Sequence, residues 1–304
     1  MKPINIITIL GPTAAGKTRV AALLADTLNS EVISADSRQV YRDMTIGTGK
    51  DLDDYRVGDR CIPTHLVDIR DAGEHYTLFD FQQDARTAIT DIDARNKRPI
   101  LCGGTGLYLS ALLEDYQLPG IPPSPERHAE LNAMDTDTLV ERLSQHGPLH
   151  NTTDTEDRNR LIRAIEIAES DTPPAPPFPL NSTTIGIRWE RETLRSRITE
   201  RLNHRLKNGM IEEVKDLLNK GISPEELNYY GLEYRYVTCY LTGDLNRNDM
   251  TQKLRSAIHQ FAKRQETWFR RMERRGIPIH WVEGSTDSTH LCDRINTAIM
   301  EQQA

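Results

Sequence analysis

The sequence predicts an α/β protein in which helices flank a parallel sheet and a mostly helical domain is inserted into the core. Three observations indicate this fold. Short apolar runs alternate with amphipathic stretches, a glycine-rich loop follows the first run, and proline-rich segments interrupt the pattern between about residues 118 and 180. At 304 residues the chain has room for about two domains, or for one large α/β domain with an insertion.

The expected strands are short runs rich in isoleucine and valine. Several are continuous instead of alternating, which is typical of strands buried on both faces of a parallel sheet. They cover residues 4–10, 31–35, 65–68, 99–102, 184–189 and 279–282.

The expected helices lie between and after these runs. Apolar residues recur at helical spacing in residues 17–28 and 78–93. Two longer helices are expected at residues 191–220 and 249–275, the second ending at Gly276.

Prolines mark the limits of the insertion. One group lies at residues 119–125 and the other at residues 173–179. We therefore expect a core made of residues 1–118 and 181–304, with an inserted helical domain of residues 119–180.

Composition and charge exclude several classes of protein. The formal net charge is −7 and the pI is near 5.8, so the chain lacks the basic excess of a nucleic-acid coat protein. A nucleic acid or other polyanion must therefore bind a local basic patch. Hydrophobic residues at 37% and charged residues at 27% argue against a membrane span and against wholesale disorder. The four cysteines form no C-x-x-C pair, so we expect reduced thiols in a cytoplasmic protein.

Residues 11–18 match the phosphate-binding pattern G-x-x-x-x-G-K-[ST], between an apolar strand and an amphipathic helix. They read Gly11, Pro12, Thr13, Ala14, Ala15, Gly16, Lys17 and Thr18. In such a loop, backbone N–H groups surround phosphate oxygens, the lysine adds a positive charge, and the threonine holds Mg²⁺. The core is therefore expected to be P-loop NTPase-like and to bind a nucleotide such as ATP or another di- or triphosphate. The loop alone does not distinguish phosphoryl transfer, hydrolysis and other reactions.

Two further polar segments follow expected strands at the same edge of the sheet. Asp36 ends the second strand, and Thr105 follows Gly103 and Gly104 after the fourth. Ligands of open α/β sheets bind at the carboxyl ends of the strands. Asp36 is then a general base or a carboxylate that fixes a substrate donor, or it simply caps the next turn; Thr105 either contacts a substrate or belongs to a turn.

With these residues the chain resembles the tRNA dimethylallyltransferases, also called tRNA isopentenyltransferases, over nearly its whole length. The resemblance rests on an ordered set of motifs whose order and spacing are specific. They are the phosphate loop, DSRQVYRDMTIGT at 36–48, HLVD at 65–68, GGT at 103–105, DRNRLIRA at 157–164, AKRQ at 262–265 and TW at 267–268.

The resemblance implies transfer of the dimethylallyl group of dimethylallyl diphosphate to N6 of the adenosine 3′-adjacent to the anticodon, with Mg²⁺ and release of pyrophosphate. The phosphate loop would hold the leaving group, with Thr13, Lys17 and Mg²⁺ on Thr18 stabilising its growing charge. Asp36 would accept the proton from N6. The implied partners are dimethylallyl diphosphate and the anticodon stem-loop of tRNA, without a membrane, and we expect a monomer.

The resemblance also implies which other residues act. Arg197 matches an arginine expected near the pyrophosphate with Thr13, which gives Asp36, Thr13 and Arg197 as catalytic residues. The residues that would contact tRNA are Asp36, Ser37, Arg38, Gln39, Thr105, Arg127, Asn159, Arg160, Leu161, Ile162 and Arg163. Without the resemblance, the arginines of residues 158–163 would be interpreted as a solvated surface. One departure concerns residues 233–236, which read Glu-Tyr-Arg-Tyr where the family often has G-Y-R-[EQ].

The helix expected at residues 249–275 carries a local positive charge. Residues 251–276 contain eight lysines and arginines against two glutamates, a charge of +6 in a chain of −7. We expect Lys253, Arg264 and Arg271 to contact the tRNA backbone. The side chains expected to pack on the core are Leu254, Ile258, Phe261, Trp268 and Met272.

Three other functions remain open on the residues alone. A P-loop kinase of a nucleotide or small metabolite would use ATP as donor and Asp36 as base. A nucleotide-switched RNA-binding protein would explain the arginine-rich helices. An adenylate isopentenyltransferase would prenylate a free nucleotide, but the inserted domain and the basic helix favour tRNA, because a free nucleotide needs no such surface.

Overall fold

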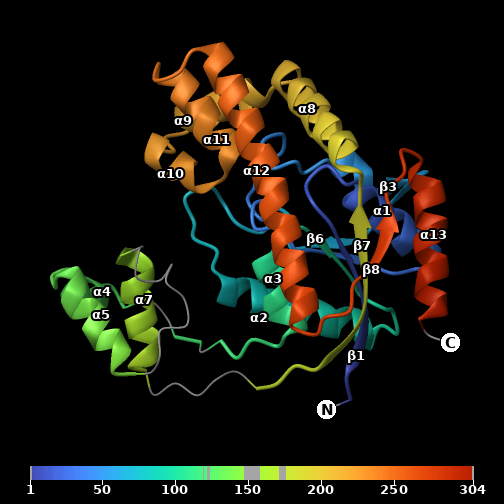
Figure 1. Cartoon of the computed structure of the whole chain (residues 1–304), viewed down its shortest axis with the longest axis horizontal. Coiled ribbons are helices and arrows are strands. Elements are labelled where there is room, and N and C mark those ends of the chain that lie inside the picture. Colours follow the sequence, from blue (N-terminus) through green and yellow to red (C-terminus); the bar gives the residue numbers. More distant parts are fainter. Residues whose placement is uncertain (1, 119, 122–123, 147–157, 171–175, 303–304) are drawn as a thin grey trace. The chain divides into compact units, whose positions relative to one another are not determined.

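The structure is a computed structural model that describes residues 2–118, 120–121, 124–146, 158–170 and 176–302 (Figure 1). The chain divides into two compact units, one of Met1–Tyr116 with Phe178–Ala304 and one of Gln117–Pro177. The first unit contains the sheet, and the second is helical.

The core of the first unit is a six-stranded parallel sheet with the order β5-β2-β6-β1-β7-β8. Its strands are β1 (Ile4–Leu10), β2 (Val32–Ser34), β5 (Thr64–His65), β6 (Ile100–Gly103), β7 (Leu180–Arg188) and β8 (His280–Glu283). β1 pairs with both β6 and β7 inside the sheet, and its last five residues are buried, as the continuous apolar run predicts. The predicted α/β fold is confirmed.

Three strands differ in length from the prediction, and one of them, β2, has three residues where five were expected. β5 contains only two residues, because Leu66 and Asp68 adopt positive φ angles of 63° and 55° that a strand does not accommodate. β7 begins at Leu180, four residues before the expected start. The sequence analysis also missed a 3-10 helix, η1 (Leu52–Tyr55), and a small antiparallel pair, β3 (Arg56–Val57) with β4 (Arg60–Cys61).

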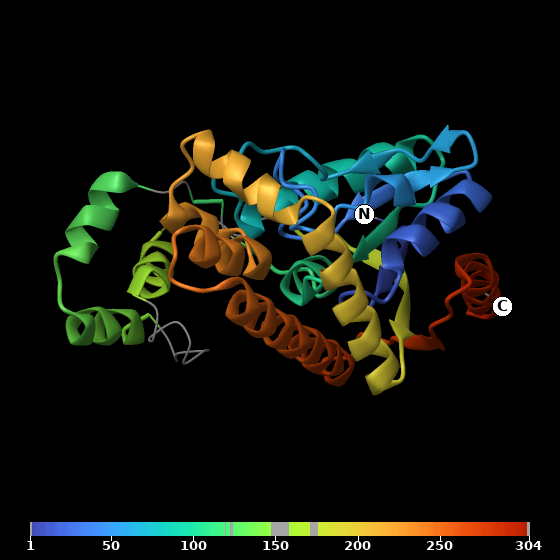
Figure 2. The same cartoon turned by 90° about the horizontal axis from the view of Figure 1, so that it is seen from above.

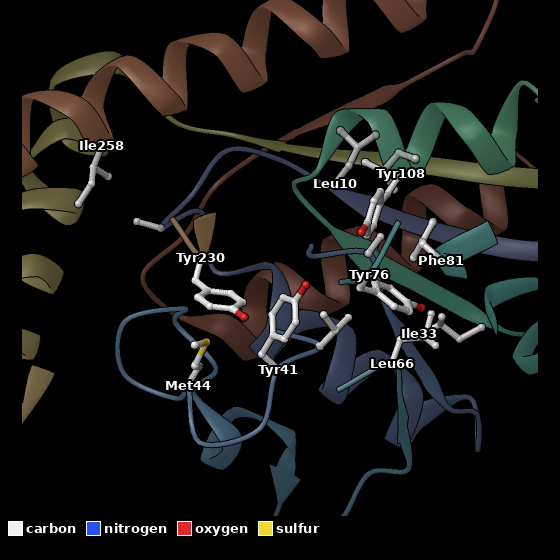
Figure 3. Close-up of a cluster of buried hydrophobic side chains, with 14 of the residues drawn as sticks. Leu10, Ile33, Tyr41, Met44, Leu66, Tyr76, Phe81, Tyr108, Tyr230 and Ile258 are labelled. Carbon is white, nitrogen blue, oxygen red and sulfur yellow. The ribbon is translucent and has the colours of Figure 1, made fainter. Parts of the chain in front are cut away.

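The two faces of the sheet pack against different helices. On one face, Ile7 of β1 belongs to a buried cluster with Leu24 of α1 (Lys17–Thr27) and with α13 (Ser288–Glu301). On the other, Leu10 belongs to a cluster with α2 (Leu78–Ala94), α3 (Gly106–Leu113) and the C-terminal helices. In this second cluster the rings of Phe81 and Tyr108 are stacked with centroids 3.9 Å apart (Figure 3).

The C-terminal helices differ from the prediction in one respect. They are α8 (Arg191–Lys207), α9 (Met210–Asn219), α10 (Pro224–Tyr229), α11 (Leu232–Leu241) and α12 (Arg247–Arg274). The single helix expected at 191–220 is wrong, because Gly209 has a φ of 101° and separates α8 from α9. α12, the long helix in Figures 1 and 2, begins two residues earlier than expected, since the Asn246 side chain accepts a hydrogen bond from the Asp249 N–H and caps it.

The buried stripe of α12 also differs in part. Ile258 and Met272 are buried as expected, but Phe261 is 37% exposed and Phe269 is fully buried. Phe269 lies three full turns after Ile258 and therefore faces the core, whereas Phe261 lies at the edge of the stripe.

The second unit contains three described helices, α4 (Pro125–Asn132), α5 (Thr136–Ser144) and α7 (Arg158–Ala168). The side chains of Ser124 and Asp135 cap the first two. A small core holds the helices together; its fully buried members are Leu131, Leu139, Leu161, Ile162 and Ile165. In either unit, no helix among the described residues is both long and apolar enough to cross a bilayer.

Candidate active site

The carboxyl ends of β1, β2 and β6 open into a cavity of about 610 Å³ in the first unit. Three segments predicted from the sequence line it, namely part of the phosphate loop, residues 36–39 after β2, and residues 102–107 around the turn after β6. Residues of α8, α11 and α12 complete the wall. The cavity lies where ligands of open α/β sheets bind.

The phosphate loop turns sharply between β1 and α1. Gly11 has a φ of 156°, and a Cβ there would lie 2.7 Å from the Ile187 carbonyl oxygen, so no larger residue fits. Gly16 has a φ of 88° and is the N-cap of α1 without a side-chain hydrogen bond. The first N–H groups of α1 are thus available to an anion. Five loop residues line the cavity: Thr13, Ala14, Gly16, Lys17 and Thr18. Gly11, Pro12 and Ala15 are buried.

Lys17 supplies a cation to this end of the cavity. Its Nζ donates to the Pro12 carbonyl oxygen at 2.8 Å. Burial, together with the nearby Arg201, lowers the pKa of Lys17 to about 8, although Cys102 and Asp36 act in the opposite direction. An anion bound here would stabilise the ammonium form and raise this pKa.

Arg201 of α8 supplies a second cation. Its guanidinium donates to the Thr13 hydroxyl, and desolvation lowers its pKa to about 10. Arg197, which the sequence analysis placed beside Thr13, instead donates from Nε to the Ala14 carbonyl oxygen at 3.0 Å and lies 4.2 Å over the Trp189 ring. The two arginines are one turn apart on an arginine-rich helix, so sequence reasoning did not separate them. Arg201, not Arg197, is the arginine that contacts Thr13 and lines the cavity.

Gln265 of α12 joins the two glycine-rich turns. Its Oε1 accepts from the Thr13 N–H at 2.8 Å, and its Nε2 donates to the Gly104 carbonyl oxygen at 2.9 Å. A Cβ on Gly104 would lie 2.5 Å from that Nε2. The sequence analysis assigned Gln265 no role, although an amide in the apolar stripe of an amphipathic helix was a signal that it has a buried partner.

Asp36 lies in the turn after β2. Its Oδ1 accepts from the Arg38 N–H at 2.9 Å, so it caps the turn. In the described part of the chain no group donates to its Oδ2, and Asp36 lines the cavity. The two interpretations of Asp36 are therefore compatible, because one carboxylate oxygen can hold the turn while the other meets a ligand.

The neighbours of Asp36 differ in what they can contact. The Ser37 N–H donates to the Thr105 hydroxyl at 3.1 Å, which joins the turns after β2 and β6. The Arg38 guanidinium lies 4.9 Å over the exposed Tyr229 ring. The Gln39 side chain is buried, accepts from Ser34 and donates to the Gly49 carbonyl oxygen at 3.2 Å, so its amide serves the protein's own loop.

Glu213 of α9 fixes the loop that follows Tyr41. Its carboxylate accepts from the backbone N–H groups of residues 45, 46 and 47 at 2.7 to 2.9 Å, and from the Tyr234 hydroxyl at 2.7 Å. Gly47 and Gly49 of this loop line the cavity. No pattern in the sequence connects Glu213 with this loop, so sequence reasoning missed it.

The second unit holds the other residues expected to contact tRNA. Arg127 forms ion pairs with Glu130 and Glu169, and Arg163 donates to Glu166 at 2.8 Å. Leu161 and Ile162 are fully buried in the unit's core, so neither residue presents a surface to a partner in this structure. Asn159 lies on α7 beside them, and the side chain of Arg160 is outside the described part of the structure.

Among the described residues, no group of three or more histidine, cysteine, aspartate or glutamate side chains is arranged to hold a metal ion. The oxygen ligands in the cavity include the Thr18 hydroxyl and the carboxylates of Asp36, Asp51, Asp54 and Glu233. A hard cation such as Mg²⁺ keeps several waters and is commonly held by few protein oxygens together with substrate phosphates. The donor set fits that type of site.

Comparison with known proteins identifies the family. The IPP transferase family model matches residues 39–272, and the isopentenyl transferase model matches residues 4–61. The chain belongs to the tRNA dimethylallyltransferase family. It is 53% identical to tRNA dimethylallyltransferase 2 of Porphyromonas gingivalis, over 95% of this chain and 97% of that protein. It is 54% identical to tRNA dimethylallyltransferase 2 of Syntrophotalea carbinolica, over 93% of this chain and 95% of that one.

Solved structures show the same fold. The tRNA isopentenylpyrophosphate transferase of Bacillus halodurans matches with a TM-score of 0.70 and 32% identity, over 99% of this chain and 98% of that one. A eukaryotic dimethylallyltransferase matches with a TM-score of 0.77, 23% identity and coverage of 98% and 80%.

Proposed function

We propose that the protein transfers the dimethylallyl group of dimethylallyl diphosphate to N6 of the adenosine 3′-adjacent to the anticodon of tRNA and releases pyrophosphate. One observation carries the proposal. A single cavity joins an anion site at the phosphate loop to a carboxylate, Asp36, in the turn after β2. Membership of the tRNA dimethylallyltransferase family supports the same conclusion.

The diphosphate occupies the end of the cavity at the phosphate loop. There it meets the first N–H groups of α1 and the two desolvated cations, Lys17 and Arg201. As the allylic C–O bond breaks, negative charge grows on the leaving pyrophosphate, and cations already fixed in place stabilise that charge without reorganising. Arg201 is oriented by the Thr13 hydroxyl, and Thr13 by Gln265.

Mg²⁺ is part of the proposal. The Thr18 hydroxyl and oxygens of the diphosphate would hold it, together with one of the carboxylates that line the cavity. When bound, the ion neutralises charge on the leaving group.

The acceptor adenine occupies the end at Asp36 and Thr105. N6 attacks the allylic carbon, the N–C bond forms as the C–O bond breaks, and the N6 proton passes to the Asp36 Oδ2. The Arg38 N–H holds the other oxygen and so orients the carboxylate. Because an aromatic amine is a weak nucleophile, alignment of N6 with the allylic carbon contributes much of the acceleration. The base must leave its stack to enter, which is easier in a single-stranded loop.

The proposal also covers the protein surface that binds tRNA, the cellular location and the oligomeric state. The second unit and the basic face of α12 supply surface for an RNA that a free nucleotide does not need. We place the enzyme in the cytoplasm, where tRNA is modified, and propose that it acts as a monomer. The kinase and adenylate-prenylating alternatives lack the support of the family.

The test is incubation with labelled dimethylallyl diphosphate and either unmodified tRNA or AMP, followed by nucleoside analysis. We expect label in N6-dimethylallyladenosine from tRNA and none in AMP. Labelled AMP would establish the adenylate isopentenyltransferase. Transfer from γ-labelled ATP to a small molecule, without prenyl transfer, would establish the kinase.

A further inference from the structure

Two exposed apolar side chains line the cavity. Six large hydrophobic residues among those described are exposed, namely Leu52, Leu107, Ile167, Tyr229, Phe261 and Met300. Only Leu107 and Phe261 belong to the cavity wall. Phe261 lies on α12, one turn before Gln265, which holds the phosphate loop. Because this partly exposed aromatic ring lies in the wall of the cavity, it is available to contact a ligand there.

The surroundings of Phe261 are cationic. The guanidinium of Arg264 lies 5.9 Å from the Phe261 ring centroid, and that of Arg271 lies 5.1 Å from the Trp268 ring centroid. Arg264 and Trp268 also line the cavity, and Arg264 and Arg271 are exposed. The ligand that covers Phe261 therefore combines an apolar or aromatic face with negative charge.

We propose that Phe261 is the stacking platform for a nucleobase next to the base that enters the cavity, with Arg264 binding the adjoining phosphate. This inference rests on the proposed function, because it assumes an RNA substrate. Removing one base from a single-stranded stack leaves its neighbours with an uncovered face. An aromatic side chain replaces that contact, and any base fits because every base has a π-face.

The dimethylallyl group of the donor fits this position less well. A prenyl chain laid on the Phe261 ring would take the neighbouring Arg264 guanidinium out of water, while the diphosphate of the donor is held by the phosphate loop. A nucleotide offers the same guanidinium a phosphate oxygen, so the charge keeps a partner.

Salt titration separates stacking from charge. tRNA binding without donor is measured over a range of salt for the wild type, Phe261→Ala, Phe261→Trp and Arg264→Gln. Stacking releases no counterions, so Phe261→Ala should weaken binding about 5- to 150-fold at every salt concentration and leave the slope of log affinity against log salt unchanged. Arg264→Gln should reduce the slope by about 0.7 to 0.9. Phe261→Trp should bind as tightly as the wild type.

Two control variants test whether the loss of tRNA affinity comes from the Phe261 ring. Phe261→Leu keeps an apolar side chain in the partly buried position but removes the ring, and it should weaken binding like Phe261→Ala with an unchanged melting temperature. Met300→Ala removes the most exposed of these six hydrophobic side chains, which lies on α13 and outside the cavity wall, and it should not change binding.

Unchanged tRNA affinity in Phe261→Ala, or a loss that appears only as a flatter salt slope, would overturn the platform. A raised KM for dimethylallyl diphosphate with unchanged tRNA affinity would assign Phe261 to the prenyl group instead. If the wild type transfers no label to tRNA, the proposed function fails, and the platform with it. If the wild type prenylates tRNA and Phe261→Ala binds it equally well, only the platform fails.

Discussion

Arg201→Met removes a desolvated cation from the cavity wall. The Arg201 guanidinium donates to the Thr13 hydroxyl, and no carboxylate in the described part of the chain accepts a hydrogen bond from it. Burial lowers its pKa to about 10. Methionine fills a similar space without charge, so the variant measures what the charge does to stability and to binding.

The effect on the unliganded protein follows from the pKa. Near pH 7 the guanidinium is charged in both folded and unfolded states, so its lowered pKa opposes folding throughout that range. The lowered pKa of Arg201 corresponds to a destabilisation of the folded protein by at most about 3 kcal/mol, and water in the cavity reduces this figure. Losing the hydrogen bond to Thr13 has the opposite effect and destabilises the variant by about 1 kcal/mol. We expect the variant to gain about 1 to 2 kcal/mol, which raises its melting temperature by about 2 to 5 °C.

The effect on binding should be opposite. Thermal melts with and without Mg²⁺ and pyrophosphate should show a ligand-induced rise in melting temperature for the wild type and little rise for Arg201→Met. Arg197→Met is the matched control, because Arg197 contacts the Ala14 carbonyl oxygen and the Trp189 ring and does not line the cavity. It should keep the pyrophosphate-induced rise.

Either of two results would refute this reasoning. One is an unliganded Arg201→Met protein that is less stable than the wild type. The other is that Arg197→Met loses the pyrophosphate-induced rise in melting temperature while Arg201→Met keeps it. That result would assign the diphosphate contact to Arg197, as the resemblance implied.

Three further predictions concern the two ends of the cavity and α12. Asp36→Asn should nearly abolish prenyl transfer, because an amide cannot accept the N6 proton, while pyrophosphate binding measured by calorimetry stays within a few-fold; unchanged turnover would remove Asp36 from the mechanism. Since burial lowers the pKa of Lys17 to about 8, its ammonium loses a proton in the unliganded protein as the pH rises through 8, so pyrophosphate affinity should be constant below that pH and fall above it. Lys17→Arg should abolish that fall, and a persisting fall would assign the titration to another group. Replacing Lys253, Arg264 and Arg271 together by glutamine should weaken tRNA binding and lower its salt slope by up to about 2 to 3, with donor affinity unchanged; an unaltered slope would make these cations an ordinary solvated face.

The parts of the fold that sequence predicts are those encoded locally. The apolar run of β1 and the glycines of the phosphate loop each specify their own backbone, and both lie where expected. The break between α8 and α9 was missed because the amphipathic pattern continues on both sides of Gly209. A glycine with positive φ ends the helix there, but a glycine inside a helical pattern is also tolerated at modest cost.

The contacts that complete the site are long-range, and the sequence contains no local sign of them. Gln265 and Thr13 are 252 residues apart, Arg201 and Thr13 are 188 apart, and Glu213 and Ile46 are 167 apart. Each pair meets only after the C-terminal helices pack on the sheet. Sequence reasoning thus found the loops that line the cavity and missed most of the side chains that hold them.

The position of α12 predicts that the donor and RNA contacts can be changed separately. Gln265 points from the buried stripe of the helix into the two glycine-rich turns, so it acts on the geometry of the phosphate loop. Phe261 lies one turn earlier at the edge of that stripe, and its ring is partly exposed to the cavity. Because the helix is continuous from Arg247 to Arg274, it fixes the spacing between these two side chains. An RNA bound across Phe261 and Arg264 is therefore held in register with the diphosphate, although no side chain has to contact both substrates.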